Sequence, residues 1–446
     1  MDDFSAKKQR LQQALASQQG KLRLRKRTIS NLFRYGSWKS DRSEGLSLAD
    51  FNNVLAVDVE NNVIDVEGLA TFESIVDAVL PLGRLPLVTP ELKHITIGGA
   101  TVGIGIESSC YRHGFVHDGL IEAEVLLPDG RIVLCNSTDA YSDLFHALPN
   151  SYGTLGYILR AKFRLMAARP FVHMKVARFA NVNEYLNAML QATEDDHIDF
   201  IEGLFFSNTC FYLMTARMVE SVPYTHDIVR KHIFYKLIQQ TDDIYLTTRD
   251  YIFRYDPDWF WNVPDTFAYR LFRRYAPGRF RNSGFYTRYC QWKEIWQRRL
   301  PWRSGKETEP LIQDWEVPWE QARELVDYAL DNVDLEGKPW TAVPIKTPAS
   351  PTIYPIKANK LYFNLGCYCN VSKAPGREAN HYTRILDQKC FNLGGIKMLY
   401  SSSFISREEF DRLYNGPGYE QLKTRYDPEQ KAYTLYEKAV SHSNIN

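Results

Sequence analysis

Four glycines lie within eight residues of the segment 96–105, whose sequence is Thr-Ile-Gly-Gly-Ala-Thr-Val-Gly-Ile-Gly. Because glycine has no Cβ, such a backbone can adopt positive φ and place its N–H groups against a phosphate or a flat ring. The preceding residues, 87–90, are expected to end an extended strand rather than to enter a tight strand–turn–helix unit. The segment therefore fits neither G-x-G-x-x-G nor G-x-x-x-x-G-K-[ST]. A plain structural loop is the alternative.

A basic loop precedes this segment and a second glycine cluster follows it. The loop 25–31, Arg-Lys-Arg-Thr-Ile-Ser-Asn, offers cations, hydroxyls and N–H groups that suit a pyrophosphate. A solvated basic loop is the alternative reading. The second cluster, 153–156, has the sequence Gly-Thr-Leu-Gly.

Two carboxylates are candidates for a proton donor. Glu107 directly follows the glycine-rich segment, and Glu202 lies among apolar residues of an expected strand, 198–206. Burial would raise the pKa of such a carboxyl group and suit it to acid catalysis. Either could instead form a buried salt bridge with Arg249 or Arg270. Weaker candidates are Tyr251, Tyr400 and Lys397. His113 and His117 flank a turn, where a structural role is the commoner one.

The first third of the chain alternates short strands with short helices. We expect helices at 6–19 and 71–80, and strands at 21–25, 54–59, 63–66, 121–127, 131–135 and 157–165. This α+β mixture predicts two small sheets packed to hold an extended cofactor. Longer segments follow Pro170: strands at 173–179, 198–206, 210–217, 340–345 and 360–367, another strand from 316 onward, helices at 182–194, 320–332 and 376–393, and a helical tail from 407 to 440.

Composition excludes several classes of protein. The 446 residues carry a net charge of +1, which gives no global reason to expect nucleic acid. The seven cysteines have no framework spacing and are predicted to be reduced thiols, and no metal site is expected. We find neither a signal peptide nor an apolar run of 18 residues, so we expect a cytoplasmic protein, soluble or attached to a membrane surface.

Blocks spread over nearly the whole chain resemble one group of proteins. They are residues 26–34, 103–109, 150–157, 199–203, 245–251, 258–261, 398–401 and 407–410. Together with the Gly114-x-x-x-Asp118 turn and the Asp129-Gly130 hairpin, their order resembles the FAD-binding domain of the vanillyl-alcohol oxidase and p-cresol methylhydroxylase (PCMH) superfamily. More narrowly, the chain resembles the delta-24-sterol reductase group and its bacterial relatives.

The resemblance implies a fold and its boundaries. The expected class is α+β, with a two-subdomain PCMH-type FAD-binding domain at 1–169 and a second α+β substrate or cap domain at 170–395. A helical C-terminal tail, 396–446, is expected to pack back on the FAD-binding domain.

The resemblance also implies which residues bind FAD. The diphosphate group would contact Lys26, Thr28, Ser30 and Asn31. The isoalloxazine and ribityl groups would contact Thr96, Gly98, Gly99, Thr101, Gly103 and Gly105, with Ser108, Gly114 and Asp118 continuing the curl. The adenine end would contact Gly153, Gly156 and Ile158. Many superfamily members tether the flavin through a His in the basic loop or a Cys before the Gly-Gly pair. Apart from His94, neither occurs here, so we predict non-covalent FAD.

The activity implied is the reduction of an isolated carbon–carbon double bond in a lipid, with NADPH as the electron donor. The substrate would be a sterol side chain or a methylene-branched fatty acyl chain, since protonation of either gives a tertiary carbocation. That reaction needs an acid (Glu202, Glu107 or Tyr251) and an aromatic pocket that excludes water. Alternatives are an oxidase or dehydrogenase of an alcohol or sugar, and a lipid-binding protein without flavin. Candidate pocket residues are Phe205, Phe206, Tyr251, Phe253, Tyr255, Trp259, Phe260 and Trp261, although packing explains most of them.

Residues 270–306 carry eleven Lys or Arg residues and a single acidic residue, Glu294, interleaved with aromatic residues. Cations attract an anionic leaflet, and Trp and Tyr favour the membrane interface. We therefore expect peripheral membrane attachment through this segment. An aromatic-packed domain surface with solvated arginines is the alternative.

Overall fold

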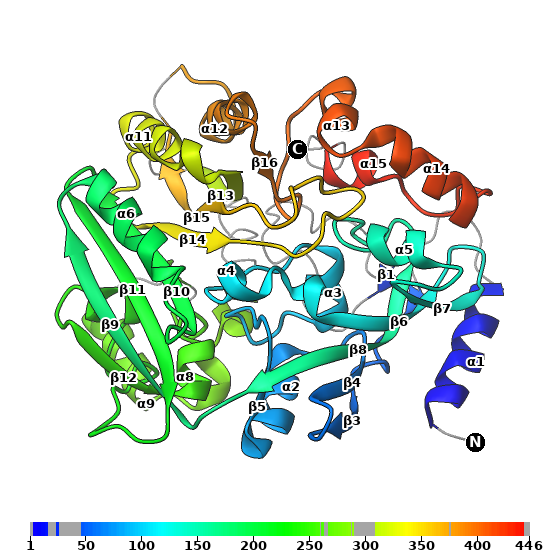
Figure 1. The fold of residues 1–446 in the computed structure, drawn as a ribbon, viewed down its shortest axis with the longest axis horizontal. Coiled ribbons are helices and arrows are strands. Elements are labelled where there is room, and N and C mark those ends of the chain that lie inside the picture. Colours follow the sequence, from blue (N-terminus) through cyan, green and yellow to red (C-terminus); the bar gives the residue numbers. More distant parts are fainter. Residues whose placement is uncertain are drawn as a thin grey trace.

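The computed structural model describes residues 3–16, 24–25, 46–258, 260–262, 266–286, 288–289, 308–373 and 376–440. The basic-loop residues Lys26, Thr28, Ser30 and Asn31 lie outside this part, as does most of 287–307. Two large antiparallel sheets with helices packed on them form most of the described part of the molecule (Figure 1), and the fold is α+β. A two-stranded parallel sheet of β1, Leu24–Arg25, and β2, Leu46–Ser47, adds to them. Within the described residues, no helix has both the length and the apolar character needed to cross a membrane.

The smaller sheet has six strands, in the order β3-β4-β8-β6-β7 with β5 on the free part of β8. Their bounds are β3 Val54–Asp58, β4 Val63–Glu67, β5 Arg84–Pro86, β6 Leu120–Leu126, β7 Ile132–Asn136 and β8 Tyr157–Ala167. Helix α2, Phe72–Val79, follows β4; the Thr71 side chain caps it by accepting from Ser74 N. Ile75, Val76 and Val79 are among the apolar residues that α2 buries, as the spacing predicts.

The larger sheet has eight strands, in the order β12-β9-β11-β10-β14-β15-β13-β16. Their bounds are β9 Phe171–Phe179, β10 Phe200–Ser207, β11 Cys210–Val219, β12 Asp243–Thr247, β13 Thr308–Pro318, β14 Trp340–Ile345, β15 Tyr362–Ser372 and β16 Ile396–Lys397. The chain passes from one sheet to the other between Ala167, at the end of β8, and Phe171, at the start of β9.

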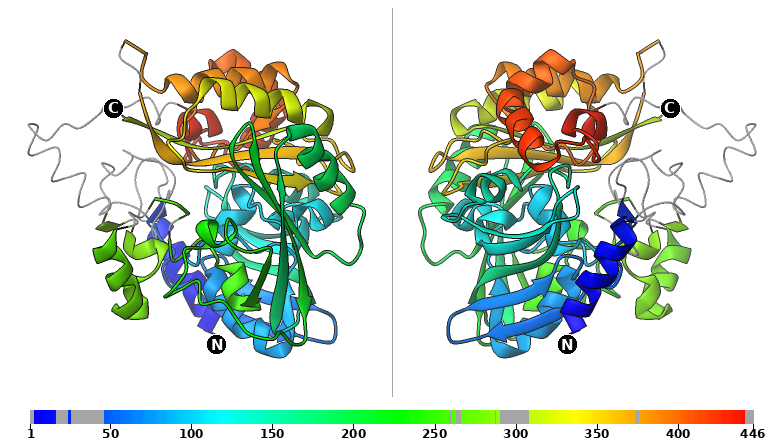
Figure 2. Two further views of the ribbon diagram at one scale, coloured as in Figure 1. Left: turned by 90° about the vertical axis from the view of Figure 1, so that its left-hand side faces the viewer. Right: turned by 90° about the vertical axis from the view of Figure 1, so that its right-hand side faces the viewer.

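Helices cover the outer side of the larger sheet (Figures 1 and 2). They are α6 Val182–Ala192, α11 Ala322–Asn332 and α12 His381–Asn392. Trp315 of β13 donates its indole N–H to Asp387 of α12 at 2.8 Å, which shows that odd-numbered residues of this strand face the helices. The opposite side of the sheet faces the short helix α4, Cys110–His113, which contacts β14. Two more short helices, α3 Ile97–Val102 within the glycine-rich segment and η3 Val116–Gly119 after it, contact β8 of the smaller sheet.

The C-terminal tail forms three helices, α13 Arg407–Leu413, α14 Gly416–Tyr426 and α15 Leu435–Ala439. Asn415, in the left-handed region with φ of 51°, separates the first two, so the tail is not one continuous helix. Helix α14 packs against α5, Ser142–Ala147, of the N-terminal half (Figure 1).

Several predicted bounds differ from the observed ones. Helix α12 begins at His381 rather than at 376, because Gly376 and Asn380 both have positive φ. Strand β13 begins at Thr308, eight residues before the expected start. The expected helix 6–19 is α1, Asp3–Ala16, and residues 17–19 lie outside the described part. Only Leu24 and Arg25 of the expected strand 21–25 are described, and they form β1.

Candidate active site

The glycine-rich segment is largely helical. Thr96 caps α3 by accepting from Gly99 N at 3.3 Å, and four of the residues 97–102 are buried. A Cβ at Gly98 would lie 2.7 Å from the carbonyl oxygen of Gly68, and one at Gly105 would lie 2.6 Å from Val116 Cγ2. The expectation of positive φ at these glycines is wrong: within the segment Ile104 has it, with φ of 57°. The missing side chains instead permit close packing of α3 against its surroundings.

Thr101, and Ser108 and Asp118 of the residues expected to continue the curl, are held by contacts within the protein. The Thr101 hydroxyl donates to Ile97 O at 2.7 Å, and Ser108 Oγ lies 3.3 Å from the Tyr251 hydroxyl oxygen. Asp118 accepts from Phe115 N at 2.7 Å and from the Thr347 hydroxyl at 2.9 Å. Gly114 has a φ of 71°, and so it occupies a backbone region that suits glycine.

The two glycine clusters meet in the folded protein. Tyr152 N donates to Val102 O at 3.0 Å, and the Tyr152 hydroxyl donates to Gly103 O at 3.3 Å. Gly153 follows with a φ of 75°, and a Cβ at Gly156 would lie 2.8 Å from Leu126 O. Predicted residues some 50 positions apart therefore border one region. Ile158, the last residue predicted for the adenine end, is buried in β8.

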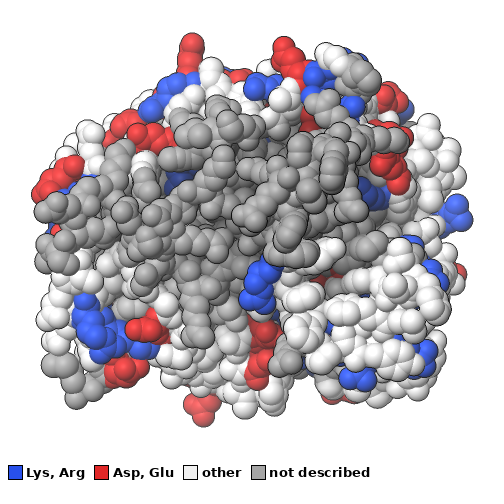
Figure 3. Space-filling view, turned by 180° about the vertical axis from the view of Figure 1, so that it is seen from behind, with Lys and Arg blue, Asp and Glu red and all other residues white. Residues whose placement is uncertain are grey.

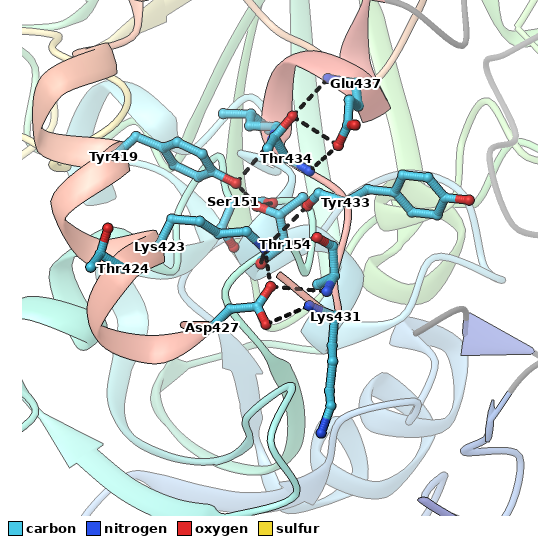
Figure 4. Close-up of polar contacts among 12 residues, drawn as sticks. Ser151, Thr154, Tyr419, Lys423, Thr424, Asp427, Lys431, Tyr433, Thr434 and Glu437 are labelled. Carbon is cyan, nitrogen blue, oxygen red and sulfur yellow. Dashed lines mark hydrogen bonds and ion pairs between the residues drawn. The ribbon is translucent and has the colours of Figure 1, made fainter. Parts of the chain in front are cut away.

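The C-terminal tail holds the second glycine cluster in place (Figure 4). The buried ammonium of Lys423 donates to Thr154 O at 2.9 Å and to Asp427 Oδ2 at 2.6 Å. It also donates to Ala432 O at 3.1 Å, and the Tyr419 hydroxyl donates to Thr154 Oγ1 at 3.0 Å. Bonds from α14 and the loop after it thus fix the backbone between Gly153 and Gly156.

The two predicted carboxylates, Glu107 and Glu202, share one buried arginine. Arg254 Nη2 lies 2.7 Å from Glu107 Oε1 and 2.6 Å from Glu202 Oε2, and Arg254 Nε donates to the same Glu202 oxygen at 3.1 Å. The Tyr255 hydroxyl donates to the other oxygen of Glu202. The anticipated salt bridge exists, but its partner is neither Arg249 nor Arg270. Arg249 pairs with Asp77 at 2.7 Å.

The charged groups of this network change one another's pKa. Burial raises the pKa of Glu202, the nearby Glu107 raises it further, and hydrogen bonds from Arg254 and Tyr255 oppose the shift. Desolvation likewise raises the pKa of Glu91 well above its ordinary value, and Glu107 adds to that shift. Because both oxygens of Glu202 accept hydrogen bonds, this arrangement favours a buried ion pair over a proton donor.

Tyr251 packs on the same guanidinium. Its ring centroid lies 4.7 Å from Arg254 Cζ, and that of Tyr255 lies 5.1 Å away. Burial raises the pKa of Tyr251. The network joins the two halves of the chain, because Arg254 pairs with Glu107 of the first half. Next to it, Ile201 N of β10 donates to Ser108 O at 2.9 Å, which also links the two halves.

Sequence reasoning missed Arg254 and Asp314. The signal for Arg254 was a cation within the run Tyr251-Ile-Phe-Arg-Tyr255, where burial would demand an acidic partner. The signal for Asp314 was the pair Asp314 and Glu316, two residues apart on a strand and therefore on one face.

Comparison with known proteins adds the cofactor. Residues 12–136 match the family described as FAD binding domain, and this match spans the basic loop and the glycine-rich segment. The chain contains an FAD-binding domain of the PCMH type. It is 25% identical over 405 residues to Delta(24)-sterol reductase of Macaca fascicularis, covering 86% of this chain and 76% of that protein.

Two further relatives extend this similarity. Delta(24)-sterol reductase of Arabidopsis thaliana is 24% identical over 90% of this chain and 77% of that protein. Cytokinin dehydrogenase 2 of Oryza sativa subsp. japonica is 32% identical, over 33% of this chain and 28% of that protein. The chain is accordingly an FAD-binding oxidoreductase with Delta(24)-sterol reductases among its relatives.

The described residues fit a flavin. Gly99, Gly103 and Gly105 are partly exposed, whereas Thr96 and Glu107 at either end are buried. A glycine-lined surface that borders a second glycine cluster suits an extended, flat cofactor.

Proposed function

We propose that this oxidoreductase reduces an isolated carbon–carbon double bond in a lipid, with NADPH as the electron donor. The similarity to Delta(24)-sterol reductases over 86% of the chain supports this choice of reaction. The observation that carries it is the meeting of the glycine clusters beside a buried network of acids and tyrosines. Suitable substrates are a sterol side chain or a methylene-branched fatty acyl chain.

Bound FAD supplies hydride chemistry, and the protein must supply orientation, exclusion of water and a proton. The residues proposed to contact FAD are those predicted above, in the basic loop and the two glycine clusters. Phe253, Phe260 and Trp261 are buried beside the Arg254 network and exclude water there. Phe205, by contrast, packs against Phe211 and belongs to the core of the larger sheet.

The proton donor predicted from sequence remains Glu202, Glu107 or Tyr251. Within the described residues, Glu107 Oε2 is buried without a hydrogen-bond partner, so it has an oxygen available to carry a proton. Glu107→Gln and Glu202→Gln should each retain FAD. If one of them is the donor, its variant loses on the order of 10²–10⁴-fold in alkene reduction while NADPH still bleaches the flavin.

Anaerobic spectroscopy tests the function. NADPH should bleach the flavin absorbance, and a lipid alkene should restore it with formation of the saturated product. Bleaching by alcohols or sugars, with oxygen consumption, would favour the dehydrogenase alternative, which the similarity to cytokinin dehydrogenase 2 supports over a third of the chain. A protein purified without flavin that cannot be reconstituted would contradict both.

We predict that FAD binding is reversible, because neither tethering residue is present. Acid precipitation should release the yellow colour to the supernatant, whereas colour in the pellet contradicts the prediction. Gly99→Val should fold and lose FAD, because the new side chain would occupy the partly exposed surface proposed for the ring. Gly395→Ala, outside the residues proposed to contact FAD, is the matched control: its Cβ would lie 2.5 Å from Glu316 O, so it should lower the unfolding temperature and leave FAD binding unchanged.

A further inference from the structure

A second buried acid lies on β13, outside the Arg254 network. Asp314 accepts hydrogen bonds from two tyrosines: the Tyr400 hydroxyl lies 2.5 Å from Oδ2, and the Tyr368 hydroxyl lies 3.0 and 2.8 Å from its two oxygens. Gly366 stands opposite on β15, where a Cβ would lie 2.7 Å from Asp314 Oδ1. Glycine there leaves room for the two hydroxyls to converge on one carboxyl group.

Unlike three other buried acids, this carboxyl group has no cation beside it among the described residues, a property that it shares with Glu316 on the same strand. Glu202 pairs with Arg254, Asp387 with Lys397 and Asp427 with Lys423. In the described part of the chain, Asp314 forms no ion pair, and its hydrogen-bond partners are neutral. Such a group can carry a proton without leaving a buried cation unpaired.

The two tyrosines link Asp314 to acidic residues beside the glycine-rich segment. Asp314 is 1% exposed, whereas Tyr368 and Tyr400 are both partly exposed. Glu91 lies close enough to Tyr368 to raise the pKa of its hydroxyl, and it also interacts with Glu107 beside the glycine-rich segment. The same face of β13 carries Glu316, whose partner Tyr354 touches Phe115 of the short helices. Asp314 therefore faces the region of the glycine clusters.

We infer that Asp314 supplies, through the hydroxyl of Tyr368 or Tyr400, the proton that the substrate alkene receives. The inference rests on the proposed function, and it moves the proton source from Glu107 or Glu202 to the larger sheet. The tyrosine that touches the alkene is the catalytic residue, and Asp314 is a positioning residue that acts through it.

The step balances as a concerted relay. With Asp314 protonated, its O–H donates to a tyrosine oxygen, which frees that tyrosine's own proton to turn toward the substrate. The alkene π pair forms the new C–H bond as the tyrosine O–H breaks, and the Asp314 proton restores the tyrosine hydroxyl. Hydride from the reduced cofactor completes the reduction at the resulting carbocation, and water later reprotonates the Asp314 carboxylate.

Titration of the cluster supports this role. Burial raises the pKa of Asp314 to about 6, against the hydrogen bonds from Tyr400 and Tyr368. The other titratable groups facing the cluster are Glu316, whose pKa burial raises to about 8, and Glu91. Since the protonated carboxyl is the active form, the rate of alkene reduction should fall as pH rises above about 6, approaching tenfold per pH unit.

The test separates the two half-reactions of the FAD-loaded protein. Asp314→Asn and the double variant Tyr368→Phe/Tyr400→Phe should bind FAD and be bleached by NADPH at the wild-type rate. Reoxidation by the alkene should fall on the order of 10²–10⁴-fold. Tyr354→Phe is the matched control, because its hydroxyl also donates to a buried acid, Glu316, but is itself fully buried. It should leave the rate and its pH profile unchanged.

A second readout does not depend on turnover. Infrared difference spectra between wild type and Asp314→Asn should show a protonated carboxyl that titrates near pH 6 and shifts in the Tyr400→Phe variant. A carboxyl already ionised above pH 4, or alkene reduction that none of these variants alters, overturns the relay. Loss of reduction in Glu107→Gln or Glu202→Gln alone also overturns it. A wild-type flavoprotein that leaves every lipid alkene unreduced contradicts the proposed function itself.

Discussion

Arg254 is the cation that neutralises the two buried acids near the glycine-rich segment. It is fully buried and pairs with Glu107 and Glu202, which come from different halves of the chain. A buried guanidinium between two carboxylates contributes little net stability compared with an apolar core, but removing it leaves two charges without a partner. Replacing Arg254 alone should therefore lower the free energy of unfolding, because the two carboxylates would remain buried without a cation.

We predict that Arg254→Met destabilises the protein by roughly 3–5 kcal/mol in chemical unfolding, because Glu107 and Glu202 lose their cation. Arg249→Met is the control. Arg249 pairs with Glu73 and Asp77 at a partly exposed site, so its loss should cost no more than about 1 kcal/mol. Equal losses for the two variants would show that Arg254 does not neutralise the acids.

At the scale of secondary-structure elements, helix α14 packs against the second glycine cluster and donates hydrogen bonds to Thr154. Lys423 is buried and shares its protons among Asp427 and the carbonyls of Thr154, Ala432 and Tyr433 (Figure 4). The tail therefore fixes the 153–156 backbone through polar contacts as well as apolar packing.

Lys423→Met should cost roughly 3–5 kcal/mol, since it leaves the buried Asp427 without its cation. It should also raise hydrogen exchange in residues 150–156 and weaken FAD binding, if that loop contacts the cofactor as proposed. Lys431→Met is the comparison, because Lys431 pairs with Glu429 at an exposed site. Unchanged exchange in 150–156 would mean that the loop holds its conformation without the tail.

At the scale of the whole molecule, helix α9, Phe267–Tyr275, lies at the periphery (Figure 2). Phe267 is 78% and Tyr275 72% exposed, with Leu271 and Phe272 exposed between them. In the reverse view this region, at the lower right, is mostly uncharged with Lys and Arg at its margin (Figure 3). Residues 287 and 290–306 of the expected segment, 270–306, lie outside the described residues, so α9 carries the argument for it.

We propose that α9 and the segment after it attach the protein to an anionic membrane. Aromatic side chains would enter the interface, and each nearby cation would add roughly 1 kcal/mol. Sedimentation with anionic liposomes should be salt-sensitive, and Phe267→Ser/Tyr275→Ser should weaken it. Leu134→Ser, which changes an exposed apolar residue on β7, is the control. Equal recovery in the supernatant with anionic and neutral liposomes at low salt would contradict attachment.

The sequence by itself determined the helix caps and hairpin turns, which depend on residues close together along the chain. Thr71 and the apolar spacing after it specify α2, and residues 54–66 specify a hairpin, because caps and turns involve residues a few positions apart. The glycine clusters and the order of motifs identified the FAD-binding domain. The sequence did not reveal that α3 is helical, because Gly98 serves a close contact with Gly68, which is distant in the sequence.

Only the tertiary structure decided which acids are neutralised. Arg254 lies 52 residues from Glu202 and 147 from Glu107, and its choice of partners depends on how β10 and α8, Thr248–Ile252, pack against the glycine-rich segment. Asp314 and Glu202 are alike in that each is a buried carboxyl group on a strand. Strand register places Tyr368 on the face of Asp314, because Asp314 pairs with Gly366 of β15. Packing of segments outside the strands brings Tyr400 to Asp314 and Arg254 to Glu202. Because both carboxyl groups are buried, these different partners decide how readily each holds a proton.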